Sequence, residues 1–403
     1  MKYLSIAPKA IYSGIEWTDE ELSIDDVTYS DLEKKHVEII REFSLSECTL
    51  DPEPLTIRVQ TEKFGTRMRK VHEYFSGLNR GISKKGFRAA QALIKDFYVS
   101  KNQIIFKSGD EIFGIYELNR SNERYLFGDE YFSSIDWSKI IDLPITQNTL
   151  IMVSAGSPNW GHYLVDELPR IAMFIGGKTS DEEVNIYLTS YSHLSKNFNV
   201  NRMEIVKILF PTRAVHFHFL DQNQVSYFHM ANFYSPITFH PFYKNGVLTR
   251  LPRSLLDAKS EISTNKPTNK IFCFRRAGSR SASESDLADL KEIFEPLGFL
   301  FYCPEENSVE HQVKTFSGAK FIMGYMGAGM CNSIFTPSGS TVVYIAPNGW
   351  EETFFWNLAN RLGHGYHVYY SQTKMESDIP EQNTLAVNVQ EILDFYGRVC
   401  DTL

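Results

Sequence analysis

The stretch NKIFCFRRAGSRSASESDLADLKEIFEPLGFLFYCP, residues 269–304, decides the fold of this chain. Its first apolar run, 269–276, predicts a buried strand. Residues 284–298 then repeat apolar side chains at helical spacing behind Ser283, a favoured helix N-cap. A second apolar run at 298–304 predicts another strand. The stretch is therefore a strand–helix–strand unit, from which parallel sheets are built.

The same alternation continues on both sides of this unit. Downstream we expect strands at 320–326, 340–347 and 364–370, and helices at 308–319, 351–363 and 388–400. Upstream we expect strands at 148–156, 183–190 and 214–220, and helices at 160–177 and 201–210. Between the two sets lies SEISTNKPTNK, 260–270, which is polar, contains Pro267 and has no periodicity. It is predicted to be a linker.

This organisation predicts an α/β protein with two Rossmann-like, doubly wound lobes facing a central cleft. The expected parts are an N-terminal lobe (1–259), the linker (260–270), a C-terminal lobe (271–380) and a C-terminal helix (381–403) that can cross back to the first lobe. In such folds ligands bind outside the carboxyl ends of the strands.

The composition excludes several classes of protein. The chain has 403 residues and is 43% hydrophobic and 22% charged, which is ordinary globular composition. No apolar stretch of about 18 residues is present, and the start of the chain lacks the apolar run of a signal peptide. The five cysteines are scattered without CxxC spacing, which argues against a disulfide framework or a zinc site. From the cysteines and the start of the chain we expect a cytoplasmic protein. The net charge of −8 argues against nucleic-acid binding.

The charge is unevenly placed. Residues 11–50 carry 3 basic and 11 acidic side chains, whereas residues 58–107 carry 12 basic and 3 acidic ones. Within 58–107 we expect an amphipathic helix with one apolar face and a basic surround. The apolar face is formed by Phe87, Ala90, Ile94 and Phe97. This helix either packs on its own lobe or contacts an anionic lipid surface, a lipid-linked acceptor or an acidic polysaccharide.

A glycine-rich turn follows the strand predicted at 320–326. In KFIMGYMGAGMCNSIF, residues 320–335, Gly324, Gly327 and Gly329 lie where a strand ends and a helix begins. Such a turn lets backbone N–H groups approach a phosphate, or simply packs tightly. The spacing is GxxGxG, so it does not match the GxGxxG fingerprint of nicotinamide cofactors.

Arginines crowd the loop after the strand at 269–276. Arg275, Arg276 and Arg280 suit a diphosphate, whose oxygens accept bidentate guanidinium contacts. The alternative is a solvated loop whose arginines pair with Glu284 and Asp286.

A third motif, SPNWGHYLVDELPR, lies in the N-terminal half at 157–170. His162, Asp166 and Arg170 recur every four residues, so one helical face presents all three. Asn159 directly precedes this helix, at the position of an N-cap residue. The imidazole or the carboxylate could deprotonate a hydroxyl, or His162 and Asp166 could simply form an ion pair on a solvated face.

Together, and in this order, the three motifs resemble those of the glycosyltransferase 61 family, also called the DUF563 family, which has plant, secretory-pathway and bacterial surface-glycan members. The family pattern Asn-x-x-His…Asp…Arg is similar to Asn159, His162, Asp166 and Arg170, and its arginine motif resembles Arg275, Arg276, Arg280 and Glu284. Its His-Gly-Ala-Gly stretch corresponds to Gly327, Ala328 and Gly329, but Met326 replaces the His. Tyr344 stands where the family has Glu in the next strand.

The resemblance implies a GT-B fold and an inverting, metal-independent transfer from a nucleotide sugar, with a UDP-sugar favoured. The implied donor-binding residues are Arg275, Arg276, Arg280, Glu284, Gly327, Ala328, Gly329 and Asn332. Asp166 is the first candidate for the catalytic base and His162 the second, with Asn159 and Arg170 on the acceptor side. No cofactor is implied.

The implied acceptor is a glycan or lipid-linked glycan of capsule or lipopolysaccharide synthesis, used beside the inner membrane. A catalytically inactive binding protein of the same fold is the alternative that Met326 and Tyr344 motivate. A nicotinamide-dependent oxidoreductase is a more distant one.

Overall fold

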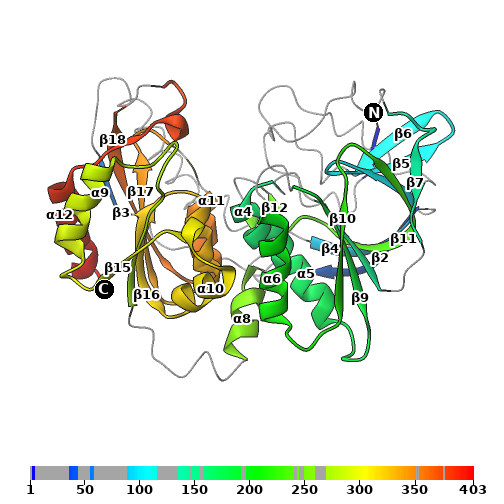
Figure 1. Cartoon of the computed structure of the whole chain (residues 1–403), viewed down its shortest axis with the longest axis horizontal. Coiled ribbons are helices and arrows are strands. Elements are labelled where there is room, and N and C mark those ends of the chain that lie inside the picture. Colours follow the sequence, from blue (N-terminus) through cyan, green and yellow to red (C-terminus); the bar gives the residue numbers. More distant parts are fainter. Residues whose placement is uncertain are drawn as a thin grey trace. The chain divides into compact units, whose positions relative to one another are not determined.

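The computed structural model describes residues 2–4, 36–43, 55–58, 89–115, 135–144, 148–153, 158–191, 197–239, 243–244, 249–258, 269–350, 352, 354–374 and 377–403. They divide into two compact units (Figure 1). The first comprises 1–45 and 87–239, and the second 46–86 and 240–403. The second unit thus begins before the linker expected at 260–270, most of which lies outside the described residues.

The second unit is built on a parallel sheet. Its strands are β14 (Asn269–Cys273), β15 (Phe299–Tyr302), β16 (Ala319–Tyr325), β17 (Thr341–Pro347) and β18 (Gly365–Thr373). They lie in the order β15-β14-β16-β17-β18, and every neighbouring pair is parallel. These five strands were predicted from the sequence. Two additions to β18 were not: antiparallel β19 (Leu385–Ala386) and parallel β3 (Leu55–Arg58).

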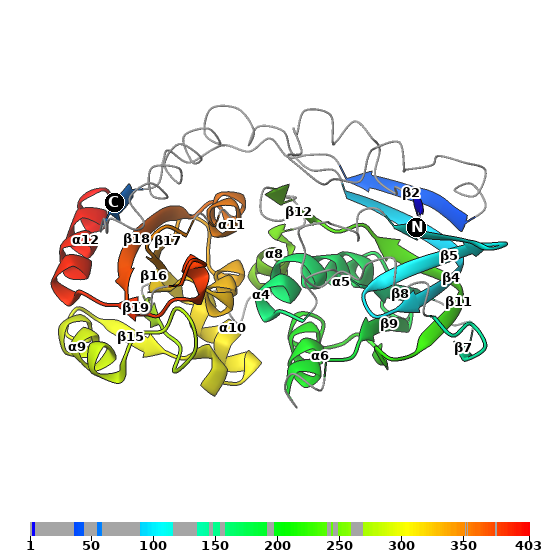
Figure 2. The same cartoon turned by 90° about the horizontal axis from the view of Figure 1, so that it is seen from above.

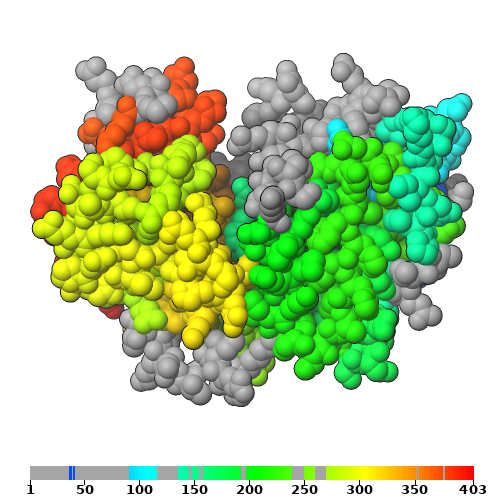
Figure 3. All heavy atoms as spheres, viewed as in Figure 1, coloured from blue at the N-terminus to red at the C-terminus, as the bar shows by residue number. Residues whose placement is uncertain are grey.

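Helices cover both faces of this sheet. Its helices are α8 (Leu251–Asp257), α9 (Glu284–Phe294), α10 (Val309–Ser317), α11 (Phe354–Leu362) and α12 (Val389–Asp401). Figure 2 shows α9 and α12 on one face and α10 and α11 on the other. The outer surface of α9 and α10 is coloured yellow-green to yellow in Figure 3. The C-terminal helix α12 packs in the core of the second unit, through residues such as Phe395.

Three helices of this unit begin directly after a residue whose side chain caps them, and the cap at Ser283 was predicted. The Ser283 hydroxyl accepts the backbone N–H of Asp286, and the Asp286 carboxylate accepts the N–H of Ser283, which together form a capping box at α9. Ser308 and Asn388 cap α10 and α12 in the same way, by accepting an N–H from the first turn.

The first unit has a curved, mixed sheet (Figure 1). Its parallel part is β8 (Thr149–Met152), β9 (Val184–Thr189) and β10 (Val215–Leu220), and β11 (Val225–Tyr234) runs parallel to β8. Beyond β11 follow the antiparallel strands β4 (Ala89–Ser100), β5 (Gln103–Ser108) and β6 (Glu111–Ile115). Three short strands join this sheet: β1 (Lys2–Leu4), β2 (Val37–Phe43) and β7 (Ile140–Asp142).

The prediction of an α/β protein is therefore confirmed, and the second unit is doubly wound as expected. The first unit is not a purely parallel, Rossmann-like lobe, because half of its sheet is antiparallel. Its helices include α5 (Leu168–Gly176) and α6 (Phe198–Leu209), both predicted from the sequence.

The amphipathic helix expected within 58–107 was a wrong prediction where the structure describes it, because Ala89–Ser100 is strand β4. Ala90, Ile94 and Phe97 are all buried. They are four and three positions apart, the same spacing as the apolar face of a helix. In a strand, residues of one face alternate, so Ile94 and Phe97 should lie on opposite faces. Asp96 between them has a φ of 49°, and the alternation of buried residues changes phase there. Residues 59–88 lie outside the described residues.

No helix among the described residues is long and apolar enough to cross a membrane. Cys273, Cys303 and Cys331 are buried free thiols and Cys400 is an exposed one, whereas Cys48 lies outside the described part of the chain.

Candidate functional site

The strand order of the second unit creates a topological switch point. From β14 the chain moves to β15 on one side of the sheet and then crosses to β16 on the other side. The loops that follow β14 and β16 consequently leave the same edge of the sheet in opposite directions. This is where doubly wound α/β proteins bind their ligands. The arginine loop follows β14 and the glycine loop follows β16, so the fold brings the two predicted motifs together.

Arg275 is the arginine that lies against the glycine loop. A Cβ atom added to Gly327 would be 3.9 Å from its Nη1 atom, and one added to Gly278 would be 3.8 Å from its Nη2 atom. Nη1 donates to the Ser279 carbonyl oxygen at 3.2 Å, while Nε is buried and has no hydrogen-bond partner. The side chain is 29% exposed, so its guanidinium can reach a bound anion.

Arg276 turns away from the glycine loop. Its Nε donates to Glu306 Oε1 at 2.6 Å and its Nη2 donates to Oε2 at 3.4 Å, a bidentate pair. Its guanidinium lies over the Phe274 ring, 5.4 Å from the centroid. An ion pair was one of the two expectations for this loop, but its partner is Glu306 rather than Glu284 or Asp286.

Arg280 has an uncommon backbone conformation, with a φ of 63°. Its N–H donates to the Asn383 carbonyl at 2.8 Å, and its guanidinium lies 4.9 Å from the centroid of the Trp350 ring. The next residue, Ser281, accepts the N–H of Leu385 at 3.0 Å. A non-glycine residue at positive φ persists only where its surroundings hold it, and such positions cluster at functional sites.

Two glycines here are closely packed, Gly324 in β16 and Gly329 in the segment that follows it. A Cβ atom at Gly324 would be 2.2 Å from the Cys273 carbonyl oxygen, so only glycine allows β14 and β16 to approach here. A Cβ atom at Gly329 would be 3.2 Å from Pro304 Cγ. Gly327 remains as the loop glycine beside Arg275. Ala328 opens η7 (Ala328–Phe335), a 3-10 helix where an ordinary short helix was expected.

Asn332 supports the glycine loop from within the core. Its side chain has no exposed surface, and its Nδ2 donates to Gln312 Oε1 at 3.1 Å and to the Gly329 carbonyl at 3.0 Å. Gln312 in turn donates to the Pro304 carbonyl at 2.9 Å. The predicted donor ligand Asn332 is thus placed to position the loop, whereas Glu284, the first residue of α9, is exposed.

Both departures from the family pattern are core residues. Met326 is 1% exposed and Tyr344 has no exposed surface. The Tyr344 ring packs between Phe355 and Tyr366, with centroids at 5.1 and 5.3 Å, and burial raises the pKa of its hydroxyl well above the ordinary value. In this chain the two positions fill the core of the second unit.

The third motif begins at a capped helix in the first unit. The Asn159 side chain accepts the N–H groups of Gly161 at 2.8 Å and His162 at 3.4 Å, so the predicted cap is confirmed. One turn, α4 (Trp160–His162), leads into η5 (Tyr163–Glu167), a π-helical turn closed by the N–H of Leu168 on the Tyr163 carbonyl. Single π-helical turns inside helices are frequent at functional sites.

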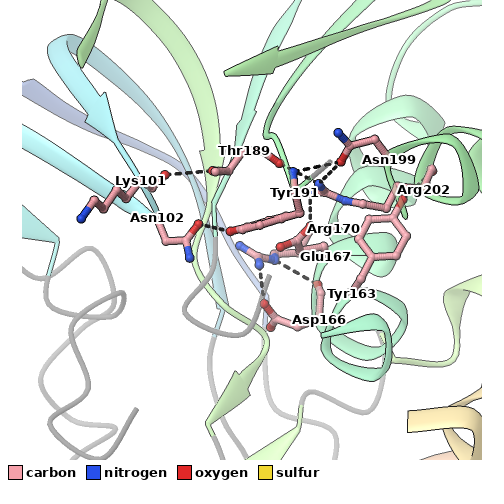
Figure 4. Close-up of polar contacts among 10 residues, drawn as sticks. All are labelled: Lys101, Asn102, Tyr163, Asp166, Glu167, Arg170, Thr189, Tyr191, Asn199 and Arg202. Carbon is pink, nitrogen blue, oxygen red and sulfur yellow. Dashed lines mark hydrogen bonds and ion pairs between the residues drawn. The ribbon is translucent and has the colours of Figure 1, made fainter. Parts of the chain in front are cut away.

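Asp166 and Arg170 form a buried ion pair on this helix (Figure 4). The guanidinium contacts Asp166 Oδ2, and its other groups donate to the carbonyls of Asp166 and Tyr234 at 3.0 and 2.9 Å. The second carboxylate oxygen of Asp166 accepts the N–H of Ile237 at 2.9 Å. Asp166 is 3% exposed and Arg170 is fully buried, so this ion pair differs from the expected alternative, a pair of His162 and Asp166 on a solvated face.

A second buried ion pair was not predicted from the sequence. Glu167 Oε2 accepts Arg202 Nη2 at 3.0 Å, and neither side chain has exposed surface. The Arg202 guanidinium also lies within 5.7 Å of three ring centroids, those of Tyr163, Tyr191 and Phe198. The only sequence signal was a charged residue next to Asp166, and its partner is 35 residues away.

The tip of the β4–β5 hairpin is tied to the same region (Figure 4). Lys101 offers its carbonyl to the Thr189 hydroxyl at 2.9 Å, and the Asn102 side chain accepts the hydroxyl of Tyr191. Lys101 has a φ of 52°, which is an uncommon backbone conformation for a residue other than glycine.

Of the three residues spaced four apart in this motif, His162 is the one that retains solvent access. It is partly exposed, unlike Asp166 and Arg170. The backbone N–H of His162 donates to the Asn159 side chain, and His162 directly precedes the π-helical turn η5. An imidazole in such a position can exchange a proton with a bound molecule.

Part of the chain is similar in sequence to known proteins. Residues 160–343 match the model of the glycosyltransferase 61 family. Over 159 residues the chain is 28% identical to an alpha-1,3-arabinosyltransferase, XAT2, of Oryza sativa subsp. japonica, an alignment that covers 38% of this chain and 26% of that relative. The chain thus spans about a quarter of the relative's length. Both comparisons show a likeness to glycosyltransferases over part of the chain.

Proposed function

We propose that this chain is an inverting glycosyltransferase that moves a sugar from a nucleotide-sugar donor to a carbohydrate acceptor. The observation that carries the proposal is the position of Arg275 beside Gly327 at the switch point of the second unit. A cationic guanidinium next to a glycine turn suits the diphosphate of a nucleotide sugar. The family match supports the transfer reaction.

The arginine and glycine loops of the second unit stabilise the leaving group in this proposal. Negative charge grows on the diphosphate as the glycosidic bond breaks, and a fixed cation at that point lowers the barrier. Arg275 supplies this cation, and its Nη1 donates to the carbonyl of Ser279, the residue before Arg280. We assign no diphosphate contact to Arg276, because its guanidinium is paired with Glu306.

We propose His162 as the base that deprotonates the acceptor hydroxyl. This reverses the order expected from the sequence, in which Asp166 came first. A general base must reach the proton that it accepts. His162 is partly exposed, whereas Asp166 is buried and both of its carboxylate oxygens have partners. Asp166 and Arg170 then act as positioning residues that hold the helix bearing His162.

The remaining features of the proposal rest on the resemblance and the relative. They are a GT-B arrangement, metal independence and a lipid-linked or polysaccharide acceptor of capsule or lipopolysaccharide synthesis. We favour a UDP-sugar donor, and UDP-pentoses belong in any test because the matched relative is named an arabinosyltransferase.

The test is a thermal-shift screen of the whole chain against nucleotide sugars, with and without EDTA, followed by donor-hydrolysis assays. A ligand that binds only the folded state raises its melting temperature. Stabilisation by one class of nucleotide sugar that persists in EDTA supports the proposal. No stabilisation by any nucleotide, with Arg275→Ala behaving like the parent chain, contradicts it.

The alternative is a catalytically inactive binding protein of the same family. It is favoured by one observation: where the family has His and Glu, Met326 and Tyr344 are buried in the core. Binding of a nucleotide sugar without hydrolysis or transfer under any acceptor condition would identify this alternative. Turnover that is lost in His162→Ala would exclude it.

A further inference from the structure

Two neighbouring glutamates follow β15, and their side chains diverge. Both belong to the short 3-10 helix η6 (Pro304–Glu306). Glu306 pairs with Arg276, which lies over Phe274. Glu305 instead has its Oε1 atom 4.0 Å from Nη2 of Arg275, the arginine beside the glycine loop. Of the two carboxylates, Glu305 is therefore the one at the switch point.

The surroundings of Cys273 agree with this placement. Cys273 ends β14 and lies opposite Gly324 of β16. Burial raises the pKa of its thiol, and the nearby Cys303 and Glu305 add to that shift. Glu305 is thus close to the carboxyl end of β14, where the chain changes direction across the sheet.

Glu305 is held in place but remains available to a ligand. Its helix is anchored by Gln312, whose Nε2 donates to the carbonyls of Pro304 at 2.9 Å and Asn307 at 3.0 Å. The Glu305 side chain is 61% exposed, and its 4.0 Å separation from Arg275 is longer than a hydrogen bond. Both groups can therefore form hydrogen bonds to one bound molecule.

The chemistry of the pair selects the kind of molecule. A guanidinium attracts a phosphate, whereas a carboxylate repels it and accepts hydrogen bonds from hydroxyl groups. In dinucleotide-binding α/β folds, an acidic residue about 20 positions beyond the phosphate loop accepts the ribose hydroxyls, while the pyrophosphate binds at that loop. Glu305 follows β15, the strand beside β14, and so occupies the equivalent place relative to the arginine loop.

We propose that Glu305 binds the ribose hydroxyls of the nucleoside diphosphate whose phosphates Arg275 binds, and thereby selects ribonucleotides over 2′-deoxyribonucleotides. The inference rests on the proposed function, because it assumes a nucleoside diphosphate at the switch point. It adds a residue that the family motifs do not include, and it names the part of the donor that this residue recognises.

The experiment is isothermal titration calorimetry of the whole chain with UDP, GDP, CDP and ADP and with their 2′-deoxy counterparts. The parent chain is expected to bind its preferred ribonucleotide about 10-fold more tightly than the deoxy form, since one charge-assisted hydrogen bond is lost. In Glu305→Ala this ratio is expected to fall to about 1, with Glu305→Gln in between. The ratio is the readout because removing a carboxylate beside Arg275 also changes the affinity for any anion.

Glu306→Ala is the matched control, because Glu306 is the neighbouring glutamate paired away from Arg275. It is expected to keep the parent ratio. An unchanged ratio in Glu305→Ala, or an equal loss in Glu306→Ala, overturns the inference but leaves the proposed function intact. If the folded parent chain binds none of these nucleotides, the proposed function fails and the inference fails with it.

Discussion

Asp166 and Arg170 lie one helical turn apart and form an ion pair whose side chains are only 4% and 0% exposed. The same carboxylate accepts the N–H of Ile237, and the same guanidinium donates to the Tyr234 carbonyl. The pair therefore fastens the motif helix to the segment that follows β11. A carboxylate used in this way stabilises the site, and its loss should be seen first in folding.

Replacing Asp166 should destabilise the first unit. In Asp166→Ala the Arg170 guanidinium stays buried without its carboxylate, which costs roughly 3–5 kcal/mol of unfolding free energy. Urea denaturation followed by circular dichroism measures this loss. A variant as stable as the parent chain but without turnover would instead return Asp166 to the role of catalytic base.

Replacing His162 should affect catalysis and leave stability unchanged. Loss of a general base typically lowers kcat by about 100- to 10,000-fold, whereas replacing a partly exposed side chain usually changes stability much less. The measurement is kcat for sugar transfer together with the melting temperature of His162→Ala. Asn159→Ala is a useful companion, because removal of the cap should lower stability by about 1 kcal/mol and kcat only modestly. Near-normal turnover of His162→Ala would exclude it as the base.

Replacing each of the two adjacent arginines, Arg275 and Arg276, should change the affinity for nucleoside diphosphates by different amounts. Arg275→Ala is expected to weaken the binding of nucleoside diphosphates by about 10- to 100-fold, the range for a lost charge-assisted hydrogen bond. Arg276→Ala should change the affinity by less than about 3-fold, because an exposed ion pair contributes little. Titration calorimetry of both variants checks this, and equal losses would mean that Arg276 leaves Glu306 to bind the ligand.

The glycines of the glycine loop should differ in what they tolerate. Gly324→Ala forces a Cβ atom against the Cys273 carbonyl and should cost about 3 kcal/mol or more, because neither strand can move away. Gly327→Ala meets its nearest atoms at 3.9 Å and should fold normally. Thermal melts of the two variants provide the comparison. A fully stable Gly324→Ala would show that β14 and β16 are farther apart than described.

The stability of the second unit should fall between pH 6.5 and pH 4 in part through His364. Burial lowers the pKa of His364 to about 4, and its ring contacts the Thr336 carbonyl. Because the unfolded chain binds this proton near pH 6.5 and the folded chain does not, the contribution is complete at neutral pH and is lost as pH falls through this window. The loss is about 3 kcal/mol by pH 4.

The check is urea denaturation of the parent chain and of His364→Asn at several pH values. The variant is expected to be less stable at pH 7 but to lose less stability on acidification. Parallel curves for the two proteins would mean that His364 takes up its proton as readily in the folded chain as in the unfolded chain.

The sequence alone was sufficient for features that depend on neighbours along the chain. The strand and helix alternation from 269 onward, the cap at Asn159 and the cap at Ser283 are all confirmed. Such features follow from side-chain periodicity and from hydrogen bonds within one turn, which need no distant partner. The proximity of the arginine and glycine loops was also predictable, because carboxyl ends of parallel strands share one edge.

Only the tertiary structure decided which charges face each other. It assigned Arg276 to Glu306 and Glu167 to Arg202, and it placed Glu305 beside Arg275. It also made Ala89–Ser100 a strand in which the alternation of buried residues changes phase at Asp96. The physical reason is the same in each case. An ion pair or a strand pairing depends on atoms brought together by the rest of the fold, and a local sequence pattern does not record them.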